Sequence, residues 1–390
     1  MTDRRQTEQT ERNWSRRDLF RAGGTLAVGG LALSAFAYTQ SAGPNAGSSA
    51  AQMGGSAAPA ATASAAAIAG SKLDAIVTDP TVLPAPIRRN SAVTHEVTLT
   101  CEEIEAEIES GVSFRYMTFG GQVPGPLIRV RQGDTVRFRL ENAPDSRMVH
   151  NIDFHAVYGT GGGAEATNVQ PDQSNGMVFQ ARYPGAFIYH CAVPNLDQHI
   201  SCGMFGMIVV EPPEGLPPVD REFYLGQHEV YTDKPTGEKG RHNFNFEAMA
   251  AETPNYVLLQ GAKTALTANR VGPLKANVGE TARVFLVNGG PNLTSNFHPI
   301  GNVWTKAWRE GAIASNPERY VQTMAVPPGS CGIFEMEFPV PETVKLVDHA
   351  LSRVARKGML GEIKVEGEAK PEIFDANPGG ESGSKGEGGY

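Results

Sequence analysis

GDTVRFRLEN (residues 133–142) and GETARVFLVN (residues 279–288) are two versions of one segment. In the first version apolar and polar side chains alternate, which is the pattern of a half-buried β-strand. Gly-Pro-Leu precedes each version, at residues 125–127 and 272–274. A segment that recurs together with its flanking turn indicates an internal repeat, so the chain is expected to contain two copies of one β-unit.

The repeat continues toward the end of each copy. Tyr183-Pro184-Gly185 leads to Ile188-Tyr189-His190-Cys191, and Val340-Pro341-Glu342 leads to Leu346-Val347-Asp348-His349-Ala350. The second copy keeps the histidine and has alanine in place of the cysteine. Short strand signals such as 97–100, separated by Gly/Pro/Asn clusters, and little helical periodicity apart from 245–251 predict an all-β protein of two tandem Greek-key β-sandwiches.

The length and the ends of the chain divide it further. With 390 residues the chain can form two domains, expected at 80–215 and 216–367. Residues 1–37 contain Ser15-Arg16-Arg17-Asp18-Leu19-Phe20 before an apolar run, which predicts a twin-arginine export signal and a periplasmic or cell-surface location. A short membrane anchor is the alternative. Residues 38–79, rich in Ala, Gly and Ser, are expected to be a linker, and 368–390 a flexible tail.

The charge and the cysteines exclude several classes of protein. A net charge of −8 with no basic tract argues against nucleic-acid binding. Four cysteines are too few and too scattered for a disulfide framework, and no CxxC pair is present. Cys101 and Cys331 could be free or paired. Cys202 is an extra thiol that either packs in the core or tunes a nearby site.

Four residues of the first copy have the chemistry of a blue-copper site. Such a site takes two imidazoles, one thiolate and a weak axial thioether, and His150, Cys191, His199 and Met204 supply this set. The last three lie on one expected loop between two strands, whereas His150 comes from a distant one. Separately, Cys191 could be a structural thiol and Met204 a core residue. Together they indicate copper.

Three further histidines predict a second metal site. His190 precedes Cys191 in a strand, so its side chain points to the opposite face. His155 lies five residues after His150, also at opposite parity. His349 aligns with His190 in the repeat, although a buried structural histidine is the alternative. Three neutral imidazoles with an open fourth position form a catalytic site, and the His190-Cys191 pair joins it to the blue-copper site.

The pattern His150-Asn151-Ile152-Asp153-Phe154-His155, with His190-Cys191, His199 and Met204, resembles the two-domain copper nitrite reductases. The similarity runs from about residue 80 to 367 and includes Phe297-His298-Pro299-Ile300-Gly301 and Val347-Asp348-His349-Ala350-Leu351. The resemblance implies cupredoxin domains, one type 1 and one type 2 copper per chain, and a homotrimer. It also implies that the type 2 copper lies at a subunit interface, with His155 and His190 from one chain and His349 from its neighbour.

The resemblance further implies the reaction, which is one-electron reduction of nitrite to nitric oxide in denitrification. A small redox protein, a cupredoxin or a cytochrome c, would donate the electron. Asp153 and His298 would manage protons beside nitrite, and Ile152 and Thr323 would belong to the substrate pocket. Asp153 could instead be a structural carboxylate and His298 a buried neutral imidazole. Gln322-Thr323 stands where the family usually has Glu-Thr, which puts a charged relay at Gln322 in doubt.

Three other functions fit the residues less well. A multicopper oxidase with a trinuclear cluster needs several His-x-His pairs, and none of the nine histidines is spaced in that way. A plain electron carrier would need only the blue copper, and neither His155, His190 and His349 nor a second domain. A copper-storing cupredoxin pair would leave Asp153 and His298 without a role.

Overall fold

The computed structural model describes residues 76–378, and strands dominate this part of the chain. The expected export signal, most of the expected linker and the last residues of the tail lie outside the described residues. Ile76 and Val77 are buried, and Val77 pairs with Val123, so four residues assigned to the linker pack in the fold. No helix within 76–378 has the length and apolar character needed to cross a membrane.

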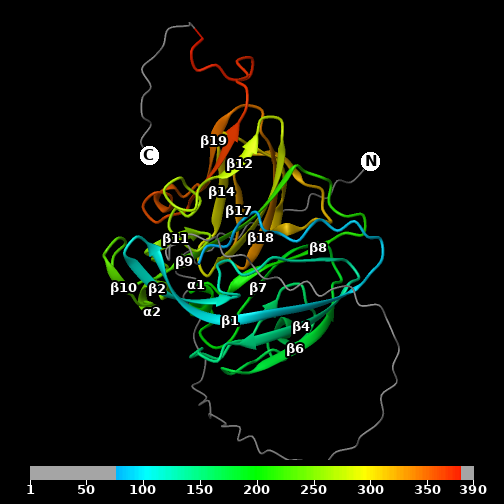
Figure 1. Ribbon diagram of the computed structural model, residues 1–390, viewed down its shortest axis with the longest axis vertical. Helices are drawn as coiled ribbons and strands as arrows, with labels where there is room; N and C mark the ends of the chain where they lie inside the picture. Colours follow the sequence, from blue (N-terminus) through cyan, green and yellow to red (C-terminus); the bar gives the residue numbers. More distant parts are fainter. Residues whose placement is uncertain (1–75, 379–390) are drawn as a thin grey trace, which may run out of the picture. The chain divides into compact units, whose positions relative to one another are not determined.

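The first β-sandwich is built from two sheets (Figure 1). One contains, in spatial order, β10 (Gly240–His242), β2 (Val112–Phe119), β1 (Thr94–Glu109), β4 (Thr135–Asn142) and β6 (Ser174–Gln180). The other contains β3 (Ile128–Arg131), β8 (Phe205–Glu211), β7 (Gly185–His190) and β5 (Asp153–Phe154). Buried residues of both sheets form one apolar core.

The second β-sandwich also has two sheets. One contains β11 (Tyr256–Leu259), β9 (Arg221–Val230), β13 (Thr281–Gly290), β18 (Ser330–Glu337), β15 (Trp304–Trp308) and β16 (Glu318–Val321). The other contains β12 (Leu274–Asn277), β20 (Leu360–Glu366), β19 (Glu342–Asp348), β14 (Ser295–Ile300) and β17 (Met324–Val326).

Helices in the described chain are short. They are α1 (Leu196–Ser201), α2 (Phe246–Ala250) and the 3₁₀ turns η1 (Thr160–Gly163), η2 (Arg309–Gly311) and η3 (Leu351–Arg353). α2 lies where the sequence predicted one or two helical turns, and the Asn245 side chain caps it by accepting a hydrogen bond from the Ala248 N–H.

The strand pairing of the two sandwiches confirms the repeat. β4 and β13 are the strands formed by the repeated segments at 133–142 and 279–288. Each has one parallel neighbour (β1 and β9) and one antiparallel neighbour (β6 and β18). In the opposite sheets, β3, β8, β7 and β5 pair in the same order and sense as β12, β20, β19 and β14. The prediction of two tandem cupredoxin-like sandwiches is therefore confirmed.

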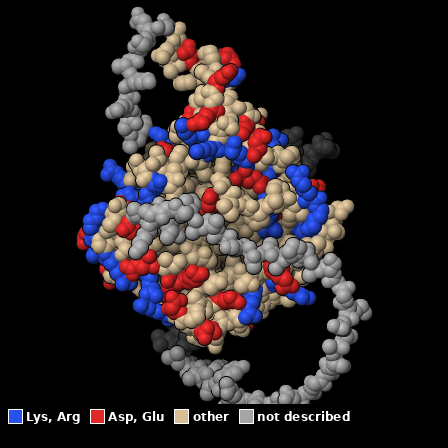
Figure 2. Space-filling view, viewed as in Figure 1, with Lys and Arg blue, Asp and Glu red and all other residues tan. Residues whose placement is uncertain are grey.

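The two sandwiches pack on each other through one sheet of each. β7 and β8 lie against β13 and β18, and the first core continues into Phe285, Val287 and Ile333 of the second sandwich. Acidic and basic side chains are interspersed over the face drawn in Figure 2, which agrees with a chain whose charge carries no extended basic tract.

Candidate metal centres

The first donor group lies at the end of β7. Cys191 follows this strand, and its Sγ lies 3.5 Å from His199 Nδ1 and 3.9 Å from His150 Nδ1. All three residues are buried. Around a metal with bonds of about 2.3 Å to sulfur and 2.0 Å to nitrogen, a trigonal arrangement separates sulfur from nitrogen by about 3.7 Å. The donor atoms therefore fit one metal ion.

The loop from Cys191 to Met204 is held by its own backbone. The Cys191 N–H donates to Met204 O (3.1 Å) and the Met204 N–H donates to His199 O (3.0 Å). The sequence predicted a loop, and the structure has the six-residue helix α1 within it, too short to give a periodic signal. Met204 has no exposed surface. These bonds hold the backbones of three of the four predicted ligands, Cys191, His199 and Met204, next to one another.

The protonation of the first group also suits a metal. Burial lowers the pKa of His199 to about 4, and burial together with the charge of His199 lowers that of His150 to about 4. Both imidazoles are therefore neutral at neutral pH and can act as ligands. Burial raises the pKa of the Cys191 thiol to about 11, so binding a cation as thiolate releases a proton.

Asn151 is a residue of this centre that the sequence analysis did not single out. Its Oδ1 accepts a hydrogen bond from the Ala192 N–H (2.7 Å) and lies 3.8 Å from Cys191 Sγ. Its amide therefore fixes the backbone directly after the thiolate. Its position beside His150 is the only sequence signal for this role.

The second donor group lies on the opposite side of the His190-Cys191 peptide, as strand parity predicted. Nε2 of His190 and Nε2 of His155 are 3.0 Å apart, and a donor oxygen of Asp153 lies within 4.8 Å of both. Two nitrogens on one tetrahedral metal are separated by about 3.3 Å, so the pair fits a shared ion. Asp153 reaches this place because β5 pairs it directly with His190.

Gly162 makes room for the Asp153 carboxylate. A Cβ at residue 162 would lie 1.8 Å from Asp153 Oδ1 and 2.8 Å from Phe154 O, and its φ is +57°. Only glycine fits without displacing the carboxylate. The three consecutive glycines of η1 indicate a turn with positive φ angles, but the sequence does not reveal that this turn faces the Asp153 carboxylate.

His349 and His298 form a separate pair on the second sandwich. Their rings are 5.2 Å apart, and His298 Nδ1 is 2.6 Å from Gln322 O. The exposed His349 is not part of the group that His155 and His190 form in this chain. Thr323 lies next to Gln322 and is half-buried.

Ile152 precedes Asp153 and Ile300 lies near His298, and these two apolar side chains differ in exposure. Ile152 is completely buried in the first core, and its N–H donates to Thr167 Oγ1. Ile300 is 41% exposed and shares a face of β14 with His298. Ile300 was missed, although its i, i+2 spacing from His298 was a usable signal.

The remaining cysteines and histidines have structural environments. All four cysteines are buried and free, which answers the open question about Cys101 and Cys331. His228 and His242 are buried, and His95 is half-buried against Asp134.

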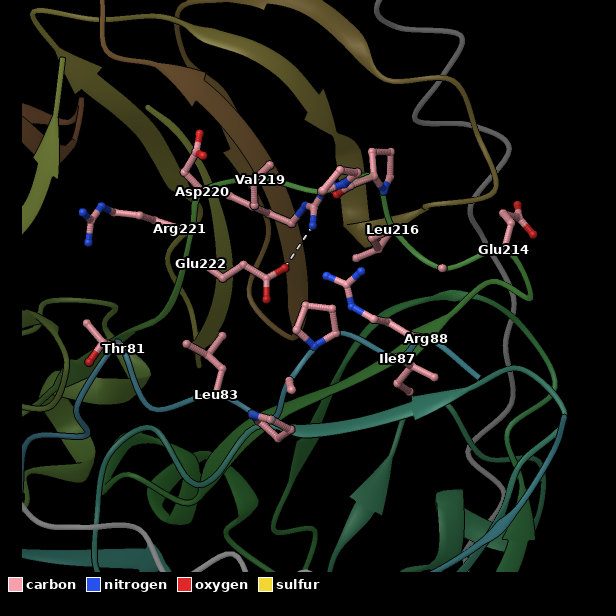
Figure 3. A pocket seen from close by; sticks show the side chains of 17 residues that line it. Thr81, Leu83, Ile87, Arg88, Glu214, Leu216, Val219, Asp220, Arg221 and Glu222 are labelled. Atoms are coloured by element: carbon pink, nitrogen blue, oxygen red, sulfur yellow. Dashed lines mark hydrogen bonds and ion pairs between the residues drawn. The ribbon is translucent and has the colours of Figure 1, made fainter. Parts of the chain in front are cut away.

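A cavity of about 430 Å³ lies apart from both donor groups, between residues 81–88 and 214–222. Glu222 lines it and is bonded to Arg283, while Leu83 and Leu216 add apolar walls (Figure 3). No histidine or cysteine lines this cavity, so it offers no set of metal donors like those of the two groups.

Similarity to known proteins agrees with this geometry. The sequence model of the multicopper oxidase family matches residues 100–215. The chain is 43% identical to the copper-containing nitrite reductase of Neisseria meningitidis serogroup B, over 77% of this chain and 76% of that protein. It is 34% identical to the copper-containing nitrite reductase of Cereibacter sphaeroides, over 76% and 84% of the two chains.

A solved structure of copper nitrite reductase from Nitrosomonas europaea superposes with a TM-score of 0.63 at 32% identity, covering 72% of this chain and 96% of that one. Identity at this level over most of both chains extends the likeness beyond the fold. The chain belongs to the copper-containing nitrite reductases.

Proposed function

We propose that this chain is a dissimilatory nitrite reductase, an oxidoreductase that converts nitrite, one electron and two protons into nitric oxide and water in denitrification. One observation carries the proposal. Two donor groups lie on opposite sides of one peptide, with Cys191 facing His150 and His199 and with His190 facing His155. An electron carrier needs only the first group.

His150, Cys191, His199 and Met204 would hold type 1 copper, and His155, His190 and His349 would hold type 2 copper. When bound, copper supplies one-electron transfer at the first site and Lewis-acid binding of nitrite oxygen at the second. The covalent link between His190 and Cys191 gives the electron a path of a few bonds from one site to the other.

The chain's own residues would deliver the protons. Asp153 lies beside His155 and His190, and His298 lies beside His349, so in the proposed shared site a carboxylate and an imidazole would flank the substrate from two sides. Thr323 and Ile300 would line the pocket on the His298 side. Ile152, which is completely buried, would shape the pocket from beneath by holding the backbone next to Asp153.

The second metal site would be completed by a neighbouring copy. The exposed His349 and the 155/190 pair are separate groups within one chain, which supports a site shared between subunits. A closed ring joins such unlike surfaces without leaving either unsatisfied, and the homotrimer is the ring we propose. A small redox protein, a cupredoxin or a cytochrome c, would supply the electron.

The division into domains 80–215 and 216–367 is supported by the break between β8, which ends at Glu211, and β9, which begins at Arg221. One short strand crosses it, because β10 belongs to the second segment and pairs with β2 of the first sandwich. We also propose that the chain is exported through the twin-arginine signal, to the periplasm or the cell surface.

The test is nitric oxide formation from nitrite by the copper-loaded chain with a reduced artificial donor. The wild type should form nitric oxide, whereas His155→Ala should keep its blue colour and lose the activity, because only the second donor group is removed. A blue wild-type protein that forms no nitric oxide would identify an electron carrier instead.

A further inference from the structure

An ion pair lies directly beside His349, and its carboxylate is buried while its guanidinium side chain is 19% exposed. Asp348, the last residue of β19, is completely buried, and Nη1 of Arg353 donates to its Oδ2 at 2.7 Å. Arg353 lies in η3, so the pair closes the short turn that carries His349. The same Nη1 donates to Thr294 O at 2.8 Å.

The Asp348 carboxylate holds the backbone on both sides of His349. Its Oδ1 accepts hydrogen bonds from the N–H of Ala350 (3.0 Å) and from the N–H (3.1 Å) and Nδ2 (3.2 Å) of Asn296. The His349 N–H donates to Asn296 O at 2.7 Å. The exposed imidazole is thus carried by a backbone that is held at the His349 N–H, at the Ala350 N–H and on the neighbouring strand at Asn296.

Strand β9 supports the pair from the interior. Gln227 is completely buried, and its Nε2 donates to Asp348 Oδ2 (3.3 Å) while its Oε1 accepts from Ser295 Oγ (2.7 Å). Every polar atom of this side chain is therefore used, and the carboxylate receives bonds from β9, β14 and η3.

Stability alone does not account for this network. Replacing a buried ion pair by apolar residues of similar volume is often neutral or stabilising, and buried ionic groups are retained in several proteins because they specify one geometry. Residues that orient metal ligands likewise specify one ligand geometry, and changing them weakens metal binding about 10- to 100-fold.

We infer that Asp348 and Arg353, supported by Gln227, are positioning residues for His349 and set the geometry with which it reaches a metal ion. The inference rests on the proposed function, because it requires His349 to be a ligand. Neither Asp348 nor Arg353 touches the substrate; both act through the His349 backbone.

The experiment compares Arg353→Gln with Arg283→Gln in the full copper-loaded chain. Arg283 is ion-paired too, with Glu335 and Glu222, and its side chain is 2% exposed against 19% for Arg353, but it lies at the level of Glu222 on β9, five residues before Gln227. Both variants break an ion pair to a buried carboxylate in the same sandwich. Only the first disturbs the His349 turn.

The readouts are copper content per chain, the blue absorption, the paramagnetic resonance signal of non-blue copper, and Tm. Arg353→Gln should bind non-blue copper about 10- to 100-fold more weakly with its blue absorption unchanged, and Arg353→Lys should recover part of that affinity. Arg283→Gln should lower Tm and leave both copper signals as in the wild type.

Equal retention of non-blue copper in the two Gln variants, or a loss in both that follows Tm, would overturn the inference. If Arg353→Gln does not fold, Gln227→Leu provides the same comparison, because it removes one bond to Asp348 and keeps the ion pair. A wild type that binds non-blue copper but forms no nitric oxide would instead contradict the proposed function.

Discussion

The predicted metal ligands are easier to recognise in the sequence than the residues that hold them in place. Cys191, His199 and Met204 were predicted as ligands because their donor chemistry is rare and their spacing is local, and distant His150 was predicted because the set needs a second imidazole. Asn151, Gly162 and Asp348 were not found. Their roles depend on which backbone or carboxylate approaches them in three dimensions, and no spacing rule encodes that approach.

Gly162→Ala should displace the Asp153 carboxylate, because the added Cβ would occupy its position at 1.8 Å. The positive φ adds strain of roughly 1–2 kcal/mol. We expect nitric oxide formation to fall by about 100- to 10,000-fold, the range of a lost proton donor, while the blue absorption remains. Gly159→Ala is the control, since its φ of +152° also strains an alanine while nothing lies within 4 Å of its Cβ position. Equal activity of the two variants would show that Asp153 does not need this turn.

The buried His228 imidazole should make stability depend on pH. Burial lowers its pKa from 6.5 to about 4 in the folded chain, against the raising effect of its bond to Ser201 O. The unfolded chain therefore binds more protons between pH 6.5 and 4, so stability falls as pH falls through this window and this contribution is constant below it. The full loss is about 3 kcal/mol.

Denaturant titrations of metal-free wild type and His228→Gln across pH 4–7 isolate this contribution, because His150 and His199 titrate in both proteins. The difference in unfolding free energy between the two should change with pH in that window. Parallel profiles would mean that His228 takes up its proton without unfolding.

At the scale of elements, strand β9 contacts the surroundings of both proposed metal sites. Gln227 faces the Asp348 network, whereas His228 on the opposite face lies 3.0 Å from Ser201 O at the end of α1, the helix that contains His199. The sequence predicted strands from alternation, but β9 is almost completely buried. A strand covered on both sides does not alternate, so its two-sided role could not be foreseen.

The second sandwich should depend strongly on β15. Trp304 is completely buried and packs against Phe297 and Phe334, with ring centroids 5.2 and 4.7 Å apart. Trp304→Ala should reduce the unfolding free energy by about 3–5 kcal/mol. Val303→Ala, one residue earlier and 41% exposed, should change it by less than about 0.5 kcal/mol. Chemical denaturation measures both, and similar values would contradict the assignment of Trp304 to the core.

At the scale of the molecule, the fold was predictable because it is repeated. Two weak strand signals at 133–142 and 279–288 become strong when each predicts the other, and β4 and β13 have equivalent neighbours. The packing of β7 and β8 on β13 and β18 was not predictable, because apolar residues facing a second sandwich look like any other core residues in the sequence.

A site shared between copies predicts complementation. His155→Ala and His349→Ala should each be inactive alone. When the two are co-expressed in equal amounts, about one quarter of the interfaces in a ring should combine an intact 155/190 pair with an intact His349. Activity per chain should therefore return to about one quarter of the wild type. Mixed assemblies without any activity would show that one chain supplies all three histidines.

Under the proposed shared site, folding of a chain and its ability to reduce nitrite become separate events, because the 155/190 pair and the exposed His349 are separate groups within one chain. A newly folded single subunit would bind blue copper and accept an electron. It would lack the complete second site at which that electron reduces nitrite. Nitric oxide, a toxic product, would then be released only by finished rings, so assembly itself would serve as a safeguard without any inhibitor.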